Sequence, residues 1–452
     1  MRLHRTLPLL LLAMASLRAE APSIQGTLPE DYLPSLRPLL KTAVERSPNT
    51  IMASIQLAQG EAVRYLDAAQ LWPQVSGGAN YAVSVESVSH GVGSTERGFF
   101  YNFGVNQSIF QWGAYKNNAV IGTLGVKIAE RSYAEAYRLL ATTIREQYMG
   151  LVTRKIALRN ARFSQKIASE AVATLKAKLE SGSASEADLQ GVTIAFQQAE
   201  LNGDRSAEDY AYAKRVFTRL VGIDDVDEDS VPLELGHPEY SASLTDAILT
   251  GFLADGVEST FQSEVYKMQV QQQDLAYSIA KVRLLPKINA SANYQLFNQS
   301  TANSGFVSQV ALQQENYSIA AYWSVFDGLA TRGAKLSALA NKRLFERIRK
   351  TYIDNTIDSI SYMRHQIALS SRAMALSEVH NALIGAEVKR ITEDLKLGYA
   401  SPATVEQSTM NLYLTEVDVA NARTDYFSRW SEFISLAGID PAIANVSPRY
   451  VR

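Results

Sequence analysis

The sequence predicts a mainly helical protein with a smaller β part, in which one structural unit occurs twice. Three observations support this prediction. Short motifs recur at nearly one offset along the chain, two pairs of segments alternate between apolar and polar residues, and very long helical segments follow each pair. Together they predict two long α-helical hairpins and four β-strands in each chain.

The repeated motifs cover the whole length of the chain. Trp72-Pro73 precedes one alternating segment and Leu285-Pro286 precedes the other, 213 residues later. Gly182 and Gly398 lie 216 residues apart in similar surroundings. A unit of this length far exceeds the roughly 20–50 residues of solenoid repeats, so each copy is half of the protein. The expected division is 1–21 signal peptide, 22–225 first repeat, 226–240 acidic linker, 241–440 second repeat and 441–452 C-terminal tail.

Composition excludes several classes of protein. The net charge is −2, so no basic field for nucleic acid exists. A positive start and an apolar run from Leu7 to Ala15 predict a secretory signal peptide, cleaved after Ala19 or Ala21. Beyond this segment the sequence contains no apolar stretch of about 20 residues, so no membrane-spanning helix is predicted. The absence of cysteine excludes disulfides, thiol chemistry and a lipid attached to an N-terminal cysteine.

In the first half, a helical pattern over residues 43–71 ends at Pro73, because proline cannot continue the helical hydrogen bonds. Residues 75–86 and 99–109 alternate with a period of two, and the polar, glycine-rich segment 87–98 predicts a long loop between two strands. Residues 115–180 predict one helix of about 100 Å, since each helical residue rises about 1.5 Å. Its apolar seam runs from Tyr133 through Tyr148 to Leu151. A second helix returns over 185–220.

The second half predicts the same order of elements. Strands are expected at 288–297 and 316–325, with a loop over 298–313. Helices are expected at 331–397 and 402–436, joined by a turn at Gly398. Pro286 precedes the first of these strands as Pro73 does in the first half.

One face of each predicted strand is apolar and rich in aromatic residues, and the other carries serine and asparagine. The proposed lipid-facing aromatic residues are Tyr81, Phe99, Tyr101, Phe103, Tyr294, Tyr317 and Trp323. Strands of 10–12 residues are long enough for a tilted membrane crossing. Four strands cannot close a barrel, and open edges in lipid leave backbone groups without partners, so several chains must share one barrel. Three chains would supply twelve strands and leave room for a pore.

With these motifs in place, the chain resembles the TolC-like outer-membrane efflux proteins over its mature length. The resemblance lies in Glu45-Arg46-Ser47-Pro48, in the two proline turns, in the glycine tips, and in Phe326-Asp327-Gly328, which follows the second strand pair. The first counterpart, Phe110-Gln111-Trp112-Gly113, departs from the usual Phe-Asp-Gly pattern. The resemblance implies a homotrimer with a twelve-stranded barrel in the outer membrane and a helical tunnel in the periplasm. It also implies two partners, a periplasmic adaptor and an inner-membrane pump that is either ABC-type or proton-driven.

The same resemblance suggests where functional residues lie. The helix tips at Gly182, Ser183, Gly398 and Tyr399 are expected to form the periplasmic mouth and to contact the adaptor. The glycines also simply end helices. In the family, acidic residues after the second tip narrow the entrance, but here Thr404 and Gln407 occupy those positions, and Asp188 has the matching place in the first half. We therefore expect a polar constriction rather than a charged one.

Other functions find little support in the sequence. The acidic residues from Asp224 to Asp229 predict a solvated linker, and the five histidines form no metal-binding motif. No phosphate loop or nucleophile elbow occurs, so neither a cofactor nor an enzymatic activity is expected. The main alternative is a periplasmic coiled-coil scaffold that conducts nothing. Drugs, metal ions, solvents and polypeptides all remain open as cargo.

Overall fold

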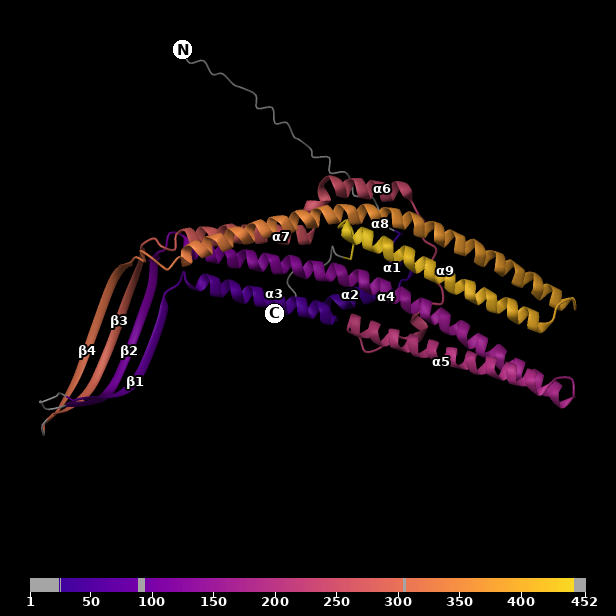
Figure 1. Cartoon of the computed structure of the whole chain (residues 1–452), viewed down its shortest axis with the longest axis horizontal. Coiled ribbons are helices and arrows are strands. Elements are labelled where there is room, and N and C mark those ends of the chain that lie inside the picture. The colour runs from indigo at the N-terminus through magenta and orange to yellow at the C-terminus, as the bar shows by residue number, and fades with distance from the viewer. Residues whose placement is uncertain (1–23, 25, 88–93, 304–305, 443–452) are drawn as a thin grey trace, which may run out of the picture.

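The computed structural model describes residues 24, 26–87, 94–303 and 306–442. The predicted signal peptide and residues 443–452 of the predicted tail lie outside the described residues. The chain is elongated, with a β-sheet at one end and long helices that extend away from it (Figure 1). Two helical tips lie at the opposite end, and small helices gather beside the middle of the long ones (Figure 1).

The two halves repeat one order of elements, which confirms the predicted duplication. The first half contains α1 (Pro29–Tyr32), α2 (Leu36–Arg46), α3 (Pro48–Ala69), β1 (Gln74–Glu86), β2 (Ser94–Phe110), α4 (Ala114–Glu180) and α5 (Glu186–Val221). A 3₁₀ turn, η1 (Glu228–Ser230), follows. The second half contains α6 (Ala242–Gly251), the π-helical turn η2 (Phe252–Gly256), η3 (Val257–Ser259), α7 (Phe261–Lys281), β3 (Lys287–Asn303), β4 (Phe306–Tyr322), α8 (Ala330–Lys396) and α9 (Pro402–Leu436).

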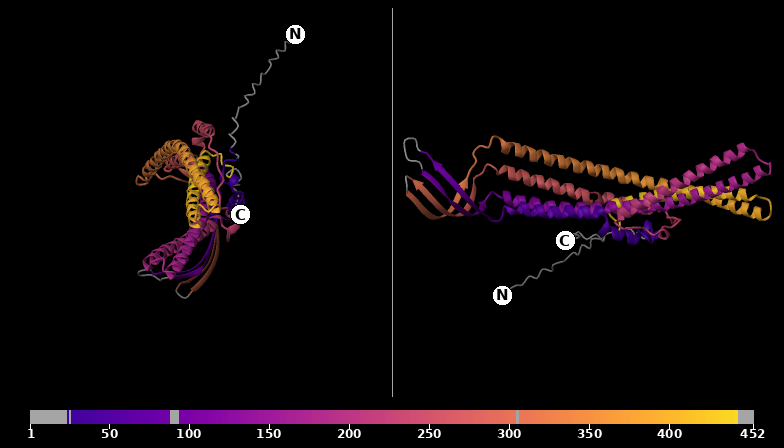
Figure 2. Two further views of the ribbon diagram at one scale, coloured as in Figure 1. Left: turned by 90° about the vertical axis from the view of Figure 1, so that its right-hand side faces the viewer. Right: turned by 90° about the horizontal axis from the view of Figure 1, so that it is seen from below.

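The four strands form one antiparallel sheet in the order β1-β2-β3-β4. The helices beside it keep the same order, since α3 packs on α4, α4 on α7, and α7 on α8. Helices α4 and α8 contain 67 residues each and continue past this layer, where α5 pairs with α4 and α9 pairs with α8. The view from below shows the long helices running from the sheet to the tips (Figure 2). No helix in the described part of the chain is both long and apolar enough to cross a membrane.

The predicted long loops between strands are wrong over 94–98 and over most of 298–313, whereas residues 88–93 and 304–305 lie outside the described residues. Strand β2 begins at Ser94 rather than at Phe99. Strand β3 ends at Asn303 rather than at Phe297, and β4 begins at Phe306 rather than at Asn316. The segments 94–98 and 298–313 are polar, which made them resemble loops in the sequence. Backbone pairing does not require apolar side chains, however, so a polar segment can remain part of a strand. The predicted first helix is also divided, because Ser47 caps α3 and Pro48 starts it.

The core lies halfway along the long helices. The predicted seam residues Tyr133, Leu140, Ile144 and Leu151 of α4 are all buried there, which confirms that part of the prediction. Phe217 of α5 and Phe427 and Trp430 of α9 are also buried in the core. Towards the tips the seam is only half-buried, for instance at Phe163 and Leu175. The middle of the molecule therefore contributes most of the burial within one chain.

Arg145 forms a fully buried ion cluster in this core. Its Nε and Nη2 donate to Glu30 of α1 at 2.9 and 2.6 Å, and its Nη1 and Nη2 donate to Asp440 at 2.5 and 2.9 Å. Burial disfavours the charged guanidinium, but hydrogen bonds and charge from Asp440 and Glu30 outweigh it and raise the pKa of Arg145. Burial, assisted by the charge of Asp440, raises the pKa of the nearby Tyr137 to about 12. The cluster ties both ends of the described chain to the middle of α4.

The segment between the halves is attached to this core rather than fully solvated. Its acidic side chains are exposed as expected, but Val226, Val231 and Leu235 are buried. Lys155 of α4 donates from Nζ to the carbonyl oxygens of Glu228 and Val231 at 2.6 and 2.7 Å. The alternation of acidic and apolar residues explains the arrangement, since one side of an extended chain can pack while the other faces water.

Candidate functional site

The strand register gathers most of the predicted lipid-facing aromatic residues on one face of the sheet. Tyr81 lies opposite Phe99, and Phe103 lies opposite Tyr294. Tyr101 pairs with Ala79, and Tyr317 with Ala292, on the same face. The Tyr81 and Phe99 rings are 4.9 Å apart, and these side chains project from the sheet without cover from their own chain. Their contact with lipid remains a prediction.

Two residues depart from the expected aromatic face. Trp323 lies one residue beyond β4, outside the sheet, although its side chain is exposed. Glu315 lies on the aromatic face opposite Tyr294, where its Oε2 accepts a hydrogen bond of 3.2 Å from the Tyr317 hydroxyl. This face is therefore less uniformly apolar on β4 than on β1 and β2.

The other face of the sheet is polar over the three rows nearest the helical end in which all four strands pair. These rows consist of Gln74, Asn106, Ser291 and Ser318, then Ser76, Gly104, Asn293 and Asn316, then Gly78, Asn102, Gln295 and Gln314. The fourth row breaks the pattern, because Phe100 and Phe297 lie opposite each other with ring centroids 5.3 Å apart. Leu312 extends this apolar row onto β4.

The turns between helices and strands form a junction in which the two halves contact each other. Pro73 and Pro286 each stand directly before a strand, as predicted from the sequence. The indole of Trp112 donates from Nε1 to the carbonyl oxygen of Pro286 at 2.6 Å, and Gln111 donates from Nε2 to Oδ1 of Asn289 at 3.2 Å. The residues Gln111 and Trp112, which depart from the family pattern, thus connect the first hairpin to the second.

Both helix tips end in a glycine with a left-handed backbone. Gly182 has φ 74° and Gly398 has φ 81°, conformations that favour glycine because it lacks Cβ. The amide of Ser183 donates to the carbonyl of Lys178 at 2.8 Å, and that of Tyr399 donates to Asp394 at 2.7 Å, which closes a Schellman motif at each tip. The Tyr399 side chain is 83% exposed, so it is available to a partner.

The three predicted constriction residues lie just beyond these tips, on two different helices. Asp188 belongs to α5, and its carboxylate accepts hydrogen bonds from the amide and hydroxyl of Ser185 at 3.1 and 2.6 Å. These hydrogen bonds lower the pKa of Asp188. Thr404 pairs with Ser401 in the first turn of α9, and Gln407 lies one turn further on. The α5 and α9 tips are separate in both views, so one chain does not bring these residues together (Figures 1 and 2).

Apolar stripes on the outer helices are a feature that the sequence analysis missed. On α8, the exposed residues Tyr362, Leu369, Leu376 and Leu383 recur every seven positions. On α5, Ile194 and Leu201 have the same spacing and are also exposed. The seven-residue spacing on α8 is visible in the sequence, but the sequence does not show that these residues stay exposed. Such a repeat is typical of a helix that packs along its length against another helix.

An ion pair between α8 and α9 also contacts the segment that joins the two halves. Glu378 of α8 accepts hydrogen bonds of 2.8 Å from His237 and from Nε of Arg423. Burial disfavours the charged carboxylate, but the hydrogen bonds from His237 and Arg423, with the charge of Arg423, outweigh burial and lower the pKa of Glu378. Among the described residues, no group of three or more histidine, aspartate or glutamate side chains is placed to hold a metal ion.

Comparison with known proteins agrees with this geometry. Residues 39–222 match the family model described as Outer membrane efflux protein. No curated protein sequence matches the chain. Among solved structures, the fold is similar to the CmeC outer membrane channel of Campylobacter jejuni, with a TM-score of 0.69 and 14% identity over 91% of this chain and 88% of that one.

Two further solved structures show the same fold. The MtrE outer membrane channel of Neisseria gonorrhoeae has a TM-score of 0.66 at 12% identity, covering 90% of this chain and 89% of that one. The VceC outer membrane protein of Vibrio cholerae has a TM-score of 0.60 at 16% identity, covering 92% and 100%. The chain thus shares the fold of these solved outer-membrane proteins. Within it, residues 39–222 are similar to the outer membrane efflux proteins.

Proposed function

We propose that this protein is the subunit of a homotrimeric exit duct, through which substrates leave passively once a pump delivers them. The observation that supports this most strongly is the open sheet. Strands β1 and β4 are its edges, and each leaves a row of backbone groups without partners in the chain. In lipid each such group costs several kcal/mol, so the edges must pair. Three copies joined β4 to β1 give twelve strands and a closed barrel with a lumen.

The helical part supports the same assembly. Next to the sheet, the outermost helices of the chain are α3 and α8. Towards the tips, the outermost helices are α5 and α8. The heptad stripes of α8 and α5 lie on these outer helices and remain exposed in one chain. In a trimer, α8 of one subunit would pack against α5 of the next, and the stripes would be buried as a coiled-coil seam. The sheet and the helices thus both require neighbours on the same two sides.

The proposed orientation assigns the remaining surfaces. The aromatic face of the sheet contacts outer-membrane lipid, and the polar face lines the lumen. The tips, with Gly182, Ser183, Gly398 and Tyr399, would extend through the periplasm to contact an adaptor, which couples the duct to an ABC or proton-driven inner-membrane pump. No catalytic residue or cofactor is needed for such a passive role. Efflux of small molecules and type I secretion of polypeptides are both compatible with this duct.

Intersubunit crosslinking tests the shared barrel. Because the chain contains no native cysteine, every disulfide forms between the introduced residues. One cysteine is placed on β1 and one is scanned along β4, and disulfide formation is followed by electrophoresis after extraction from outer membranes. A closed trimeric barrel gives covalent dimers and trimers at one register. A pair placed on Val75 and Val105, which face each other within one chain, is the control and should crosslink only internally. Only monomers from every β1–β4 pair would refute the proposal.

The polar constriction is tested by conductance. If Thr404 and Gln407 of three subunits ring the entrance, divalent cations should block the channel weakly, and Gln407→Ala should alter that block. The same measurement on Asp188→Asn tests whether the matching position at the other tip also contributes to the cation block. Block that is identical in wild type and Gln407→Ala would remove Gln407 from the constriction. A trimer that extracts intact from outer membranes yet never conducts would instead favour the alternative, a periplasmic coiled-coil scaffold.

A further inference from the structure

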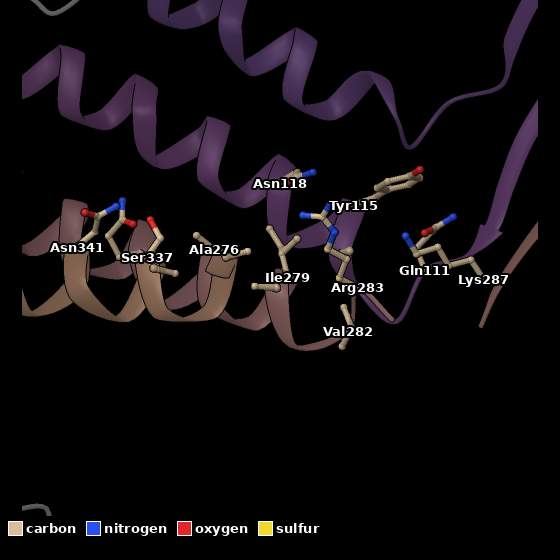
Figure 3. A pocket seen from close by; sticks show the side chains of 15 residues that line it. Gln111, Tyr115, Asn118, Ala276, Ile279, Val282, Arg283, Lys287, Ser337 and Asn341 are labelled. Atoms are coloured by element: carbon tan, nitrogen blue, oxygen red, sulfur yellow. The ribbon is translucent and has the colours of Figure 1, made fainter. Parts of the chain in front are cut away.

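A pocket of about 420 Å³ lies at the junction between the sheet and the helices. It is bounded by the end of α7 and by the beginnings of α4 and α8 (Figure 3). Its polar lining comes chiefly from Gln111, Tyr115, Asn118, Arg283, Lys287 and Asn341. Figure 3 shows Arg283 reaching towards Tyr115 and Asn118, with Gln111 beside Lys287. The volume is in the range of pockets that hold small organic ligands.

The pocket lies on the polar side of the sheet. Lys287 begins β3 and, because strand side chains alternate, shares a face with Asn289 and Ser291. Gln111 in the pocket wall donates directly to Asn289 on that face at 3.2 Å. In the proposed duct this face lines the lumen, so the pocket opens into the passage where the tunnel meets the barrel.

The charge of the pocket is positive. Among the described residues, Arg283 and Lys287 are the charged residues that line it, and no acidic side chain does. Arg283 is partly neutralised by Asp327, with 3.6 Å between Nε and Oδ2, but the same Oδ2 also accepts from the amide and hydroxyl of Thr331. Lys287 forms no ion pair within the described part of the chain. An ammonium group beside neutral hydrogen-bond donors is suited to an anion.

We infer that this pocket binds a small organic anion, one that carries a carboxylate, sulfonate or phosphate group, and that the duct favours anionic cargo. The binding site itself is complete within one chain, whereas its role in transport rests on the proposed function. Three copies would place six cationic side chains around the passage, above an entrance at which Thr404 and Gln407 are neutral and Asp188 is the predicted carboxylate. Anions passing through would exchange between these sites and the lumen.

Benzene-1,3-disulfonate is a suitable probe, because it is a compact dianion with an apolar body. Its binding is measured by isothermal titration calorimetry on the full chain in lipid nanodiscs. Lys287→Gln should weaken binding by about tenfold, as expected when a charge-assisted hydrogen bond is lost, and Lys287→Glu should abolish it. Lys116→Gln is the matched control, because Lys116 lies on α4 beside the pocket but does not line it. Equal binding by Lys287→Glu and wild type, or no binding by wild type, would overturn the assignment.

The transport part of the inference is measured separately, as the reversal potential of single channels in a potassium chloride gradient. Lys287→Glu should shift the selectivity towards cations, and Lys116→Gln should leave it near that of wild type. An unchanged reversal potential in Lys287→Glu would show that the pocket does not influence what passes. Failure of the duct itself would appear differently, as an absence of channels and of intersubunit crosslinks while disulfonate binding persists.

Discussion

Replacing Arg145 with methionine should strongly destabilise the protein, because it breaks the buried ion cluster. The guanidinium has no exposed surface and donates four hydrogen bonds to two carboxylates, of which Asp440 is itself 3% exposed and Glu30 7%. Methionine has a similar volume, so the change creates little cavity. It does leave two carboxylates buried without a cation, which costs about 3–5 kcal/mol in comparable cases. Dividing this free energy by an unfolding entropy of about 2.1 cal/mol/K per residue gives a fall of about 3–5 °C in the midpoint of thermal unfolding.

A second substitution separates loss of the cation from disturbance of the site. Asp440→Asn keeps Arg145 paired with Glu30 and removes one of two negative charges, so it should lower the midpoint by less than Arg145→Met. Adding Glu30→Gln and Asp440→Asn to Arg145→Met should recover part of the loss, because no unpaired charge then remains. Circular dichroism of the detergent-solubilised protein measures these midpoints. If Arg145→Met unfolds at the wild-type temperature, or Asp440→Asn is the more harmful change, the ion cluster does not stabilise the fold as argued.

Three further expectations follow from the same structure. The pKa of Glu378 is lowered in the folded state, so the stability that this carboxylate contributes is present above about pH 4.5 and is lost as the pH falls through its pKa in the folded state. The melting temperature of Glu378→Gln should therefore fall less than that of wild type between pH 6 and 4. Phe103→Lys, on the aromatic face, should cost about 2–4 kcal/mol if that position faces the middle of the bilayer, and heat-modifiable electrophoresis should show less trimer than for Asn102→Lys on the polar face. Leu376→Asp should weaken the trimer in size-exclusion chromatography by placing a charge in the proposed coiled-coil seam, and an unchanged elution volume would contradict that seam.

The order of elements could be predicted because the signals in the sequence are local and occur twice. The ends of α9 agree with the prediction at both Pro402 and Leu436, where a proline in the first turn and a following glycine act through the backbone alone. The period of two in the strands likewise placed the aromatic residues on one face. The loops were predicted wrongly because polarity was taken as evidence against a strand, and in this sheet a polar strand still pairs.

The pocket and the apolar stripes could not be predicted in the same way. Arg283 and Lys287 stand on opposite sides of Pro286, and nothing near them in the sequence indicates that Tyr115 and Asn118 line the same cavity. The stripe at Tyr362, Leu369, Leu376 and Leu383 looks like core in the sequence, and only the positions of α7 and α9 show that these residues remain exposed. The Phe100 and Phe297 row emerges only once the register of β2 and β3 is known.

The sequence by itself determined the duplication, the lengths of the long helices α4, α5, α8 and α9, and the two-sided character of the strands, because periodicity and helix-ending residues act over a few neighbouring positions. Only the tertiary structure decided which residues meet across the chain. Arg145 joins Glu30 and Asp440 over 115 and 295 positions, and Gln111 joins Asn289 over 178. Contacts at such separations depend on how the helices and strands pack, and packing is a property of the whole fold rather than of any local segment.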